Sequence, residues 1–143
     1  MTAPAGSRLA VGLRAIVTHV VGEADTAAAM GSGDVPVLGT PRLLALAEAA
    51  TVAAVAPRLD DGQTSVGTAV HLEHRRASPL GAELAVEAEL TEIDGPRLVF
   101  MFIARGARAG EDGEGEVIGA GTVERVVVDR GRFLTRLAGP PLA

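Results

Sequence analysis

The chain has 143 residues, of which 48% are hydrophobic and 22% charged, and its formal net charge is −5. This balance predicts one globular domain over residues 1–143 and disfavours nucleic-acid or membrane-surface binding, because both need a basic patch. The chain has neither cysteine nor lysine, which excludes disulfides, thiolate catalysis and Schiff-base chemistry.

The first forty residues predict a strand followed by a loop. Residues 1–9 form a loose leader without the apolar core of a secretory signal, so we expect a cytoplasmic protein. Residues 11–21 are rich in β-branched side chains and predict a strand. Residues 22–39 carry glycine and proline and predict a loop, with a short helical turn at 24–30.

A long helix is predicted from Thr40 to Pro57, with Thr40 as its N-cap and Pro41 in its first turn. The helix is apolar all round, a pattern typical of a helix covered on every side. Glu48 is its single acid. Either Glu48 faces solvent as an ordinary surface residue, or it is a buried carboxylate with a function.

The second half of the chain predicts an antiparallel sheet. Turn signals at 60–62 and 94–96 and a loop at 106–115 separate the strands, and a loose tail follows at 138–143. One long helix against about five strands indicates an α+β domain. A second subunit would cover the rest of the helix, which favours a homodimer. The predicted strands of this half are 65–77, 83–93, 97–105 and 116–129.

Strand alternation places two histidines on opposite faces of the strand 65–77. His74 shares a face with Val66, Thr68, Val70 and Leu72, while Gly67 and His71 lie on the other. A single core-facing histidine is usually structural, but opposite a helix that carries Glu48 it would complete an acid/base pair. The three histidines have no metal-ligand spacing, so we expect neither a metal nor a cofactor.

Arg125 stands in an apolar row of the last strand, together with Gly119 and Gly121. Its stem could simply pack while its head reaches an edge, or the guanidinium could hold a substrate carbonyl, a carboxylate or the internal acid. Gly39 and Thr40 open the helix, where free N–H groups favour a developing negative charge and a glycine admits a carbonyl. The alternative for Thr40 is a purely structural cap.

Four segments together resemble the fluoroacetyl-CoA thioesterase family of hotdog-fold proteins, over about residues 11–135. The resemblance implies a hotdog fold, a long helix wrapped by an antiparallel sheet, in dimers with sites at the subunit interface. It also implies hydrolysis of an acyl-CoA or related thioester by Thr40, Glu48 and His74, with substrate contacts at Gly67 and Arg125. The segments are 37–40 before the alanine-rich helix with Glu48, 67–74, Pro79 with Gly81, and 119–125.

The chain departs from the family in the segment before Thr40. The fluoroacetyl-CoA enzyme has phenylalanines in a lid there, whereas this chain has Gly31 and Asp34 at the matching positions. We therefore expect a different or broader acyl pocket. Two alternatives to hydrolysis stay open: a non-catalytic hotdog protein that binds an acyl-CoA or other small ligand, and a hotdog dehydratase that uses the same histidine and acid.

Overall fold

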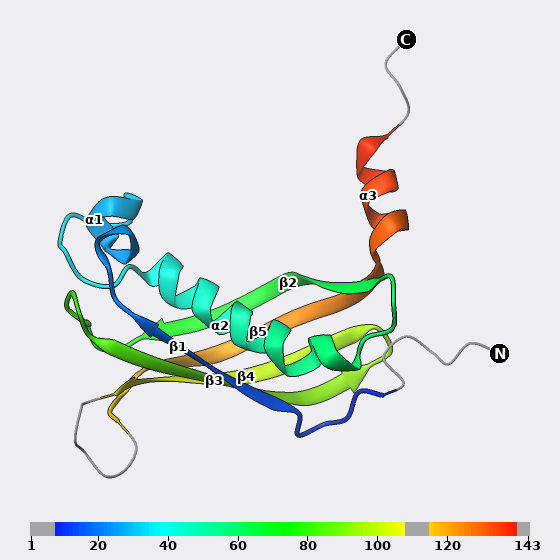
Figure 1. The fold of residues 1–143 in the computed structure, drawn as a ribbon, viewed down its shortest axis with the longest axis horizontal. Coiled ribbons are helices and arrows are strands. Elements are labelled where there is room, and N and C mark those ends of the chain that lie inside the picture. Colours follow the sequence, from blue (N-terminus) through cyan, green and yellow to red (C-terminus); the bar gives the residue numbers. More distant parts are fainter. Residues whose placement is uncertain (1–7, 108–114, 140–143) are drawn as a thin grey trace.

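The computed structural model describes residues 8–107 and 115–139 and consists of a five-stranded sheet with one long helix packed on it (Figure 1). The sheet is antiparallel throughout, and its strand order β1-β3-β4-β5-β2 leaves β1 and β2 as its edges. The strands are β1 (Arg14–Val20), β2 (Gln63–His74), β3 (Glu83–Asp94), β4 (Arg97–Ala107) and β5 (Val117–Asp129).

The long helix is α2 (Thr40–Val55), and it is continued by the short turn η2 (Ala56–Arg58). The loop before it contains the turn η1 (Glu23–Asp25) and the single-turn helix α1 (Ala27–Met30). The predicted helix and strands are thus present within a few residues of their expected ends. Thr40 is the first helical residue rather than the N-cap. The N-cap position is held by Gly39, which has no side chain with which to cap the helix.

The hydrophobic core lies between α2 and the sheet, and it is aliphatic apart from two phenylalanines. Burying this apolar area is the main force that holds the helix on the sheet. The core side chains that are fully or almost fully buried include Leu43, Ala47, Ala50 and Val55 of α2, and Leu84, Val86, Leu98, Phe100, Phe102 and Val123 of the sheet.

The sheet covers one side of α2, and the other side is exposed in the single subunit, where a second subunit is expected from the sequence to cover it. Ala45, Ala49 and Ala53 point outward, and Val52 is 40% exposed. The helix is apolar on this outer side as well. Among the helices in the described ranges, none has the length and hydropathy needed to cross a membrane.

A third helix, α3 (Arg130–Ala138), follows β5 directly and was not expected from the sequence. Asp129 begins it, since its carboxylate accepts a hydrogen bond from the Arg132 N–H. The leader also differs from expectation, because Leu9 packs into the core. The rest of the expected leader, the end of the tail and most of the loop 106–115 lie outside the described residues.

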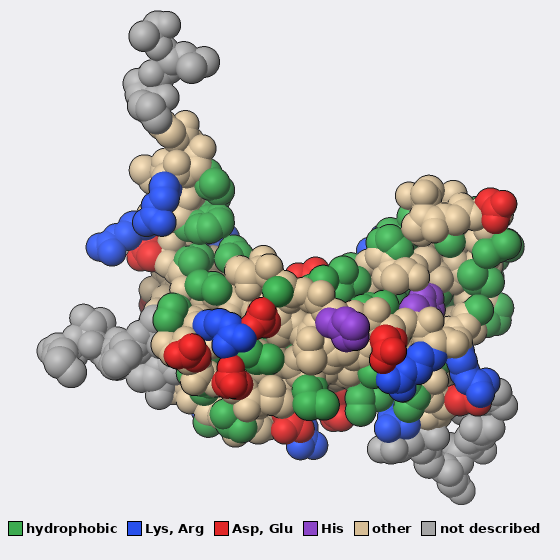
Figure 2. Space-filling view, turned by 180° about the vertical axis from the view of Figure 1, so that it is seen from behind, with side chains coloured by type: hydrophobic (Ala, Val, Ile, Leu, Met, Phe, Trp, Pro, Cys, Tyr) green, Lys and Arg blue, Asp and Glu red, His purple; other side chains and the backbone are tan. Residues whose placement is uncertain are grey.

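The β2 edge of the sheet forms the floor of a broad hollow. Helices α1 and α3 rise on the same side of this edge, at its opposite ends (Figure 1). The space-filling view shows the hollow between these two ends from behind (Figure 2). The segment of β2 from residue 67 to residue 71 is exposed.

Candidate active site

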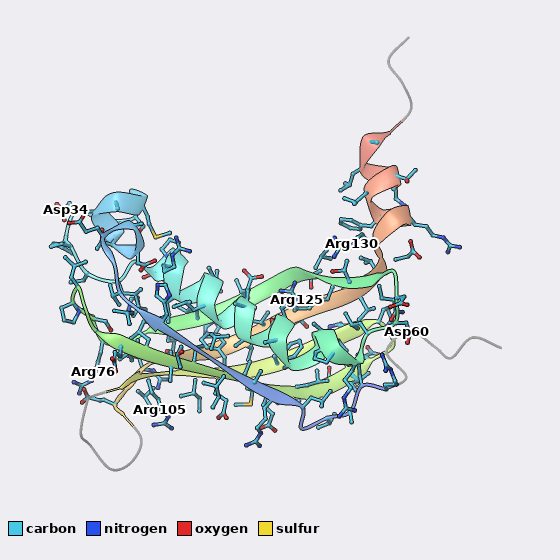
Figure 3. All side chains as sticks on the ribbon, in the orientation of Figure 1. Asp34, Asp60, Arg76, Arg105, Arg125 and Arg130 are labelled. Carbon is cyan, nitrogen blue, oxygen red and sulfur yellow. The ribbon has the colours of Figure 1, made fainter. Side chains whose placement is uncertain are left out.

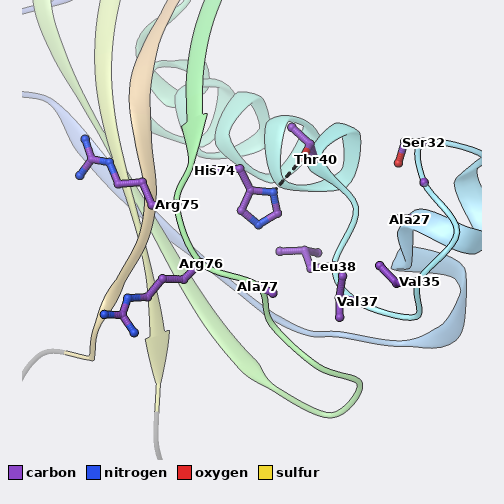
Figure 4. A pocket seen from close by; sticks show the side chains of 11 residues that line it. Ala27, Ser32, Val35, Val37, Leu38, Thr40, His74, Arg75, Arg76 and Ala77 are labelled. Atoms are coloured by element: carbon purple, nitrogen blue, oxygen red, sulfur yellow. Dashed lines mark hydrogen bonds between the residues drawn. The ribbon is translucent and has the colours of Figure 1, made fainter.

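Thr40 and His74 form a hydrogen-bonded pair where the start of α2 meets the end of β2 (Figure 4). The Thr40 Oγ1 and His74 Nδ1 atoms are 2.9 Å apart. A neutral ring that carries its proton on Nε2 accepts the Thr40 proton at Nδ1. This is the distance at which a histidine can activate a hydroxyl or relay a proton through it.

The surroundings of His74 favour the neutral form of its ring. Burial lowers the pKa of His74 from its ordinary value of 6.5, and the backbone of Arg76 opposes this shift to a smaller extent. The Nε2 atom is buried and has no hydrogen-bond partner within the described residues. Because most buried polar side-chain atoms are satisfied, this nitrogen marks a place where a ligand or water would be bound.

A pocket of about 280 Å³ opens beside this pair, between the loop before α2 and the residues after β2 (Figure 4). Arg75 and Arg76 lie at its rim, and their side chains are more than half exposed. Each arginine also forms an exposed ion pair, with Glu73 and Glu116 respectively. The other residues that line the pocket are mostly small or aliphatic: Ala27, Ser32, Gly33, Val35, Val37, Leu38 and Ala77.

A second polar cluster lies under the middle of α2, where Figure 3 labels Arg125. The Arg125 Nη1 donates to Glu48 Oε2 at 3.3 Å, while Nε and Nη2 donate to the hydroxyl and carbonyl of Ser65 at 2.8 and 3.0 Å. The Arg125 side chain is 8% exposed. Burial lowers the pKa of its guanidinium and the Glu48 carboxylate opposes that shift, so the group remains a cation.

Glu48 is therefore neither fully buried nor an ordinary surface acid. Its side chain is 35% exposed, and its carboxylate is held between Arg125 and Gly67. The same contacts decide between the alternatives for Arg125, because its guanidinium binds the Glu48 carboxylate, which is the internal acid. Ser65, which fixes two of the three guanidinium nitrogens, was not among the residues expected at the site.

Gly67 faces α2, which corrects the face assigned to it by strand alternation. The pairing of β2 with β5 shifts between Gly67 and Ala69, so Thr68 is an extra residue that reverses the alternation. Gly67 is the register partner of Arg125. A Cβ atom at Gly67 would lie 2.5 Å from Glu48 Oε2, so only glycine leaves room for the carboxylate in this position.

Gly39 has a structural role that the sequence did not predict. Its N–H, expected to face a ligand, donates to the Asp25 carbonyl at 2.8 Å. A Cβ on Gly39 would come within 3.1 to 3.3 Å of Met30 and Ala27, so a larger residue would crowd the loop where it packs on the helix start. The N–H of Thr40 has no hydrogen-bond partner within the described residues and is the free donor there.

Asp25 fixes the helix start through its side chain as well as its carbonyl. Asp25 is buried, with 7% of the residue exposed. Its carboxylate lies 2.7 Å from His19 Nε2 and 2.9 Å from Arg42 Nε, and it accepts a hydrogen bond from the Gly22 N–H. Burial by itself would raise the pKa of Asp25, but these hydrogen bonds and positive charges outweigh it and lower the pKa. The carboxylate thus stays ionised as an anchor.

The loop between Asp25 and Gly39 is closed at its base by backbone hydrogen bonds. Besides the bond from Gly39 to Asp25, the Ala27 N–H donates to the Val37 carbonyl at 2.8 Å. Residues 31–36 form the tip of this loop and are exposed. The loop tip therefore lies next to the pocket, while the base holds Thr40 in place.

The expected catalytic set is divided between two clusters in one subunit. Thr40 and Glu48 are eight residues apart on α2, which corresponds to about 12 Å along a helix axis. No hydrogen bond or ion pair joins Glu48 to Thr40 or His74 in the described part of the chain. A single subunit thus presents Thr40 with His74 at one place and Glu48 with Gly67 and Arg125 at another.

The region of the chain that matches a known family contains both clusters. The family model described as fluoroacetyl-CoA-specific thioesterase matches residues 21–131. A curated fluoroacetyl-CoA thioesterase from Streptantibioticus cattleyicolor is 39% identical over 97 residues, which are 68% of this chain and 65% of that protein. The match thus spans slightly less than two thirds of the length of that relative.

Solved structures agree in fold over almost the whole chain. The fluoroacetyl-CoA thioesterase FlK is 32% identical with a TM-score of 0.78, covering 93% of this chain and 98% of that one. A variant of it in complex with acetyl-CoA is 31% identical, also with a TM-score of 0.78, over 92% and 100%. A thioesterase superfamily member from Thermus thermophilus, 23% identical, shares the fold with a TM-score of 0.80 over 90% of both chains.

The fold inferred from the sequence is thus confirmed as a hotdog fold, with the sheet wrapped around α2. The family resemblance is confirmed as well, since the matched region includes Thr40, Glu48, Gly67, His74 and Arg125. The chain belongs to the fluoroacetyl-CoA-specific thioesterase family.

Proposed function

We propose that the chain is a cytoplasmic, homodimeric acyl-CoA thioesterase whose catalytic residues are Thr40, Glu48 and His74. The observation that carries this proposal is the 2.9 Å hydrogen bond between Thr40 and His74 at the mouth of a pocket. Membership in a thioesterase family supports the same chemistry. Gly67 and Arg125 are proposed as substrate-binding residues, and Gly39 acts by shaping the helix start.

The reaction is the hydrolysis of a thioester to a carboxylic acid and a free thiol. The Thr40 N–H is the donor placed to stabilise the negative charge that develops on the carbonyl oxygen. Glu48 either attacks the carbonyl carbon or removes a proton from the attacking water. His74 shuttles the proton that the thiolate leaving group takes up, and Thr40 orients the ring or the substrate.

A dimer would join the two clusters that one subunit keeps apart. The exposed edge strand β2 has free backbone groups along the segment 67–71, and such an edge favours pairing with another strand. Antiparallel pairing of two β2 strands about a two-fold axis would bring the half of one strand that contains Gly67 towards the His74 end of the other. The uncovered apolar side of α2 would then meet the partner.

The protein is proposed to accept a wider range of acyl groups than fluoroacetyl. The lid segment of this chain contains no aromatic residue, because the only aromatic side chains are Phe100, Phe102 and Phe133. The pocket beside Thr40 is lined instead by alanine, valine and leucine side chains. Aliphatic walls of this kind favour apolar acyl chains. Arg75 and Arg76 at the rim would meet the phosphates of coenzyme A.

The test is the release of free thiol from short-, medium- and aryl-chain acyl-CoA esters by the purified protein. Glu48→Gln keeps the shape of the side chain but removes the carboxylate, and we expect it to lower kcat by about 10²- to 10⁴-fold. Glu89→Gln, which removes one partner of an exposed ion pair with Arg14, is the matched control and should retain full activity.

Three results would contradict hydrolysis by this set. Undiminished turnover in Glu48→Gln would remove Glu48 from the mechanism. Tight binding of acyl-CoA esters without thiol release would support the non-catalytic binding protein. Formation of an enoyl product from a 3-hydroxyacyl-CoA, without free thiol, would support the dehydratase.

A further inference from the structure

Helix α3 leaves its own subunit at the end of β5 and projects away from the body (Figure 1). We propose that α3 is an arm that packs against a second copy of this chain and forms a wall of the Thr40–His74 pocket in that copy. This inference rests on the homodimer proposed above and deepens it, because the site of each subunit would be incomplete without the partner's arm.

The arm carries apolar side chains that its own subunit leaves uncovered. Leu134 is 54% exposed and Leu137 is 70% exposed, and Phe133 is only partly buried. These three residues fall on one stripe of the helix, whereas Arg132 and Arg136 lie on other sides. Hydrophobic side chains cover the side of α3 that faces the hollow, and arginine side chains point away from it (Figure 2).

A short helix of this kind needs a surface to pack on. Isolated helices below about 12–15 residues are marginal in water, and α3 has 9 residues. Most helical stability in proteins comes from packing of an apolar face. The exposed stripe of Leu134 and Leu137 is therefore a face that requires a partner, and within the described residues the hollow beside it is open (Figure 2).

The position of α3 along the edge strand identifies the partner surface. Asp129, which precedes α3, pairs with Gln63, and the Arg130 N–H donates to the Gly62 carbonyl. The arm thus rises at the Gln63 end of β2, while the pocket lies at the His74 end. Two-fold antiparallel pairing of β2 exchanges these ends, so the arm of one subunit stands beside the pocket of the other.

The pocket end offers a matching apolar surface. Met30 is 37% exposed and Val35 is 50% exposed, and Val35 also lines the pocket. In its own subunit this surface is out of reach of α3, because α1 and α3 stand at opposite ends of the hollow (Figure 1). Contact between the two apolar surfaces would exclude water from both and narrow the opening of the pocket.

Cysteine cross-linking tests this arrangement directly, since the natural chain contains no cysteine. The double variant Val35→Cys/Leu137→Cys is treated with a short bismaleimide and analysed on a denaturing gel. We expect a covalent dimer, because the two positions can meet only between subunits. The matched control Val35→Cys/Thr135→Cys places the second thiol on the opposite side of α3 and should give much less dimer, as should either single variant.

Light scattering on the same samples separates the two proposals. A dimer that cross-links through Leu137 and not through Thr135 supports the arm. A dimer that shows no such difference overturns the arm and leaves the proposed function standing. A monomer overturns both the arm and the dimeric site.

Activity gives an independent readout. In Leu134→Asp/Leu137→Asp we expect KM for an acyl-CoA ester to rise by at least about tenfold, because both leucine contacts of the arm are lost. Thr135→Asp adds a charge to the outward side of the same helix and should leave KM unchanged. Equal KM values in both variants and in the natural protein would overturn a role of α3 at the pocket.

Discussion

The carboxylate of Glu48 occupies the space that any side chain at Gly67 would need. The distance from an ideal Cβ at Gly67 to Glu48 Oε2 is 2.5 Å, and the next contact of that Cβ is with Arg125 Nη1 at 3.6 Å. The absence of a side chain on β2 thus lets an acid from the helix reach an arginine on β5. This relationship makes Gly67 a part of the site through shape alone.

Gly67→Ala is expected to lower thioesterase activity without unfolding the protein. The added Cβ meets the far end of a flexible side chain, so Glu48 can move aside at a cost within about 1 kcal/mol of unfolding free energy. The moved carboxylate would lose its place beside Arg125. The measurements are kcat/KM and the midpoint of urea unfolding. Gly106→Ala is the matched control, because its Cβ would make only an ordinary contact at 3.8 Å.

Gly121→Ala, unlike Gly67→Ala, is expected to destabilise the whole domain. A Cβ at this position would lie 1.9 Å from the His71 carbonyl oxygen, and a backbone atom cannot move without separating β2 from β5. We expect a loss of about 3 kcal/mol or more. Denaturant unfolding checks this, and a stability equal to that of the natural protein would show that the two strands are spaced differently.

The pH dependence of hydrolysis is expected to report the neutral form of His74. Because burial lowers its pKa, the ring stays unprotonated below its ordinary value of 6.5, and the acid limb of kcat/KM should lie below that pH. His71→Gln should leave the limb in place, since His71 is exposed. An acid limb at or above pH 6.5 would contradict the assignment.

The lowered pKa of His74 also makes the stability of the fold depend on pH in a defined direction. Between the lowered folded pKa and 6.5, the unfolded chain binds a proton that folded His74 does not. The His74 contribution therefore favours folding above this window and decreases as pH falls through it. Unfolding free energies measured across the window, for the natural protein and His74→Asn, should converge towards low pH.

Asp25→Asn is expected to loosen the start of α2. The substitution leaves Arg42 without its anion, and we expect a loss of about 2 kcal/mol, less than for a fully buried pair because Arg42 is partly exposed. The lowered pKa of Asp25 means that this stability is present above its ordinary value of 3.8 and is lost as pH falls through the folded pKa. Equilibrium unfolding should show a difference between the two proteins at pH 7, and this difference should shrink as the pH falls below 3.8.

Sequence patterns predicted the elements of the hotdog fold because those elements have strong local signals. The β-branched runs, the turns around Gly62 and Gly95 and the alanine-rich helix all depend on neighbouring residues. Helix α3 was missed because its sequence follows a strand without a loop and carries a glycine in its first turn. Its signal is the Asp129 cap, which is short and local.

The site was predicted less completely, and the reason is long-range register. The alternation that placed His74 on the helix side is correct from Val70 onward, but the bulge at Thr68 reverses it for Gly67. Ser65 and Asp25 are bound to partners 60 and 17 positions away, Arg125 and Arg42, so no local pattern marks them. Alternation along one strand cannot reveal where its neighbour shifts.

The loop before α2 has a closed base, which holds Thr40 in a fixed position, and an exposed tip, which lies next to the pocket. Thr40 is anchored through Gly39 and Asp25, whereas the backbone hydrogen bonds of the exposed tip 31–36 go only to Ala27 and Ala28. Residues at the tip can therefore be exchanged, or the tip lengthened, without displacing the hydroxyl that meets His74. Substrate choice in this scaffold can diverge by changes at the tip alone, while the reacting groups stay fixed.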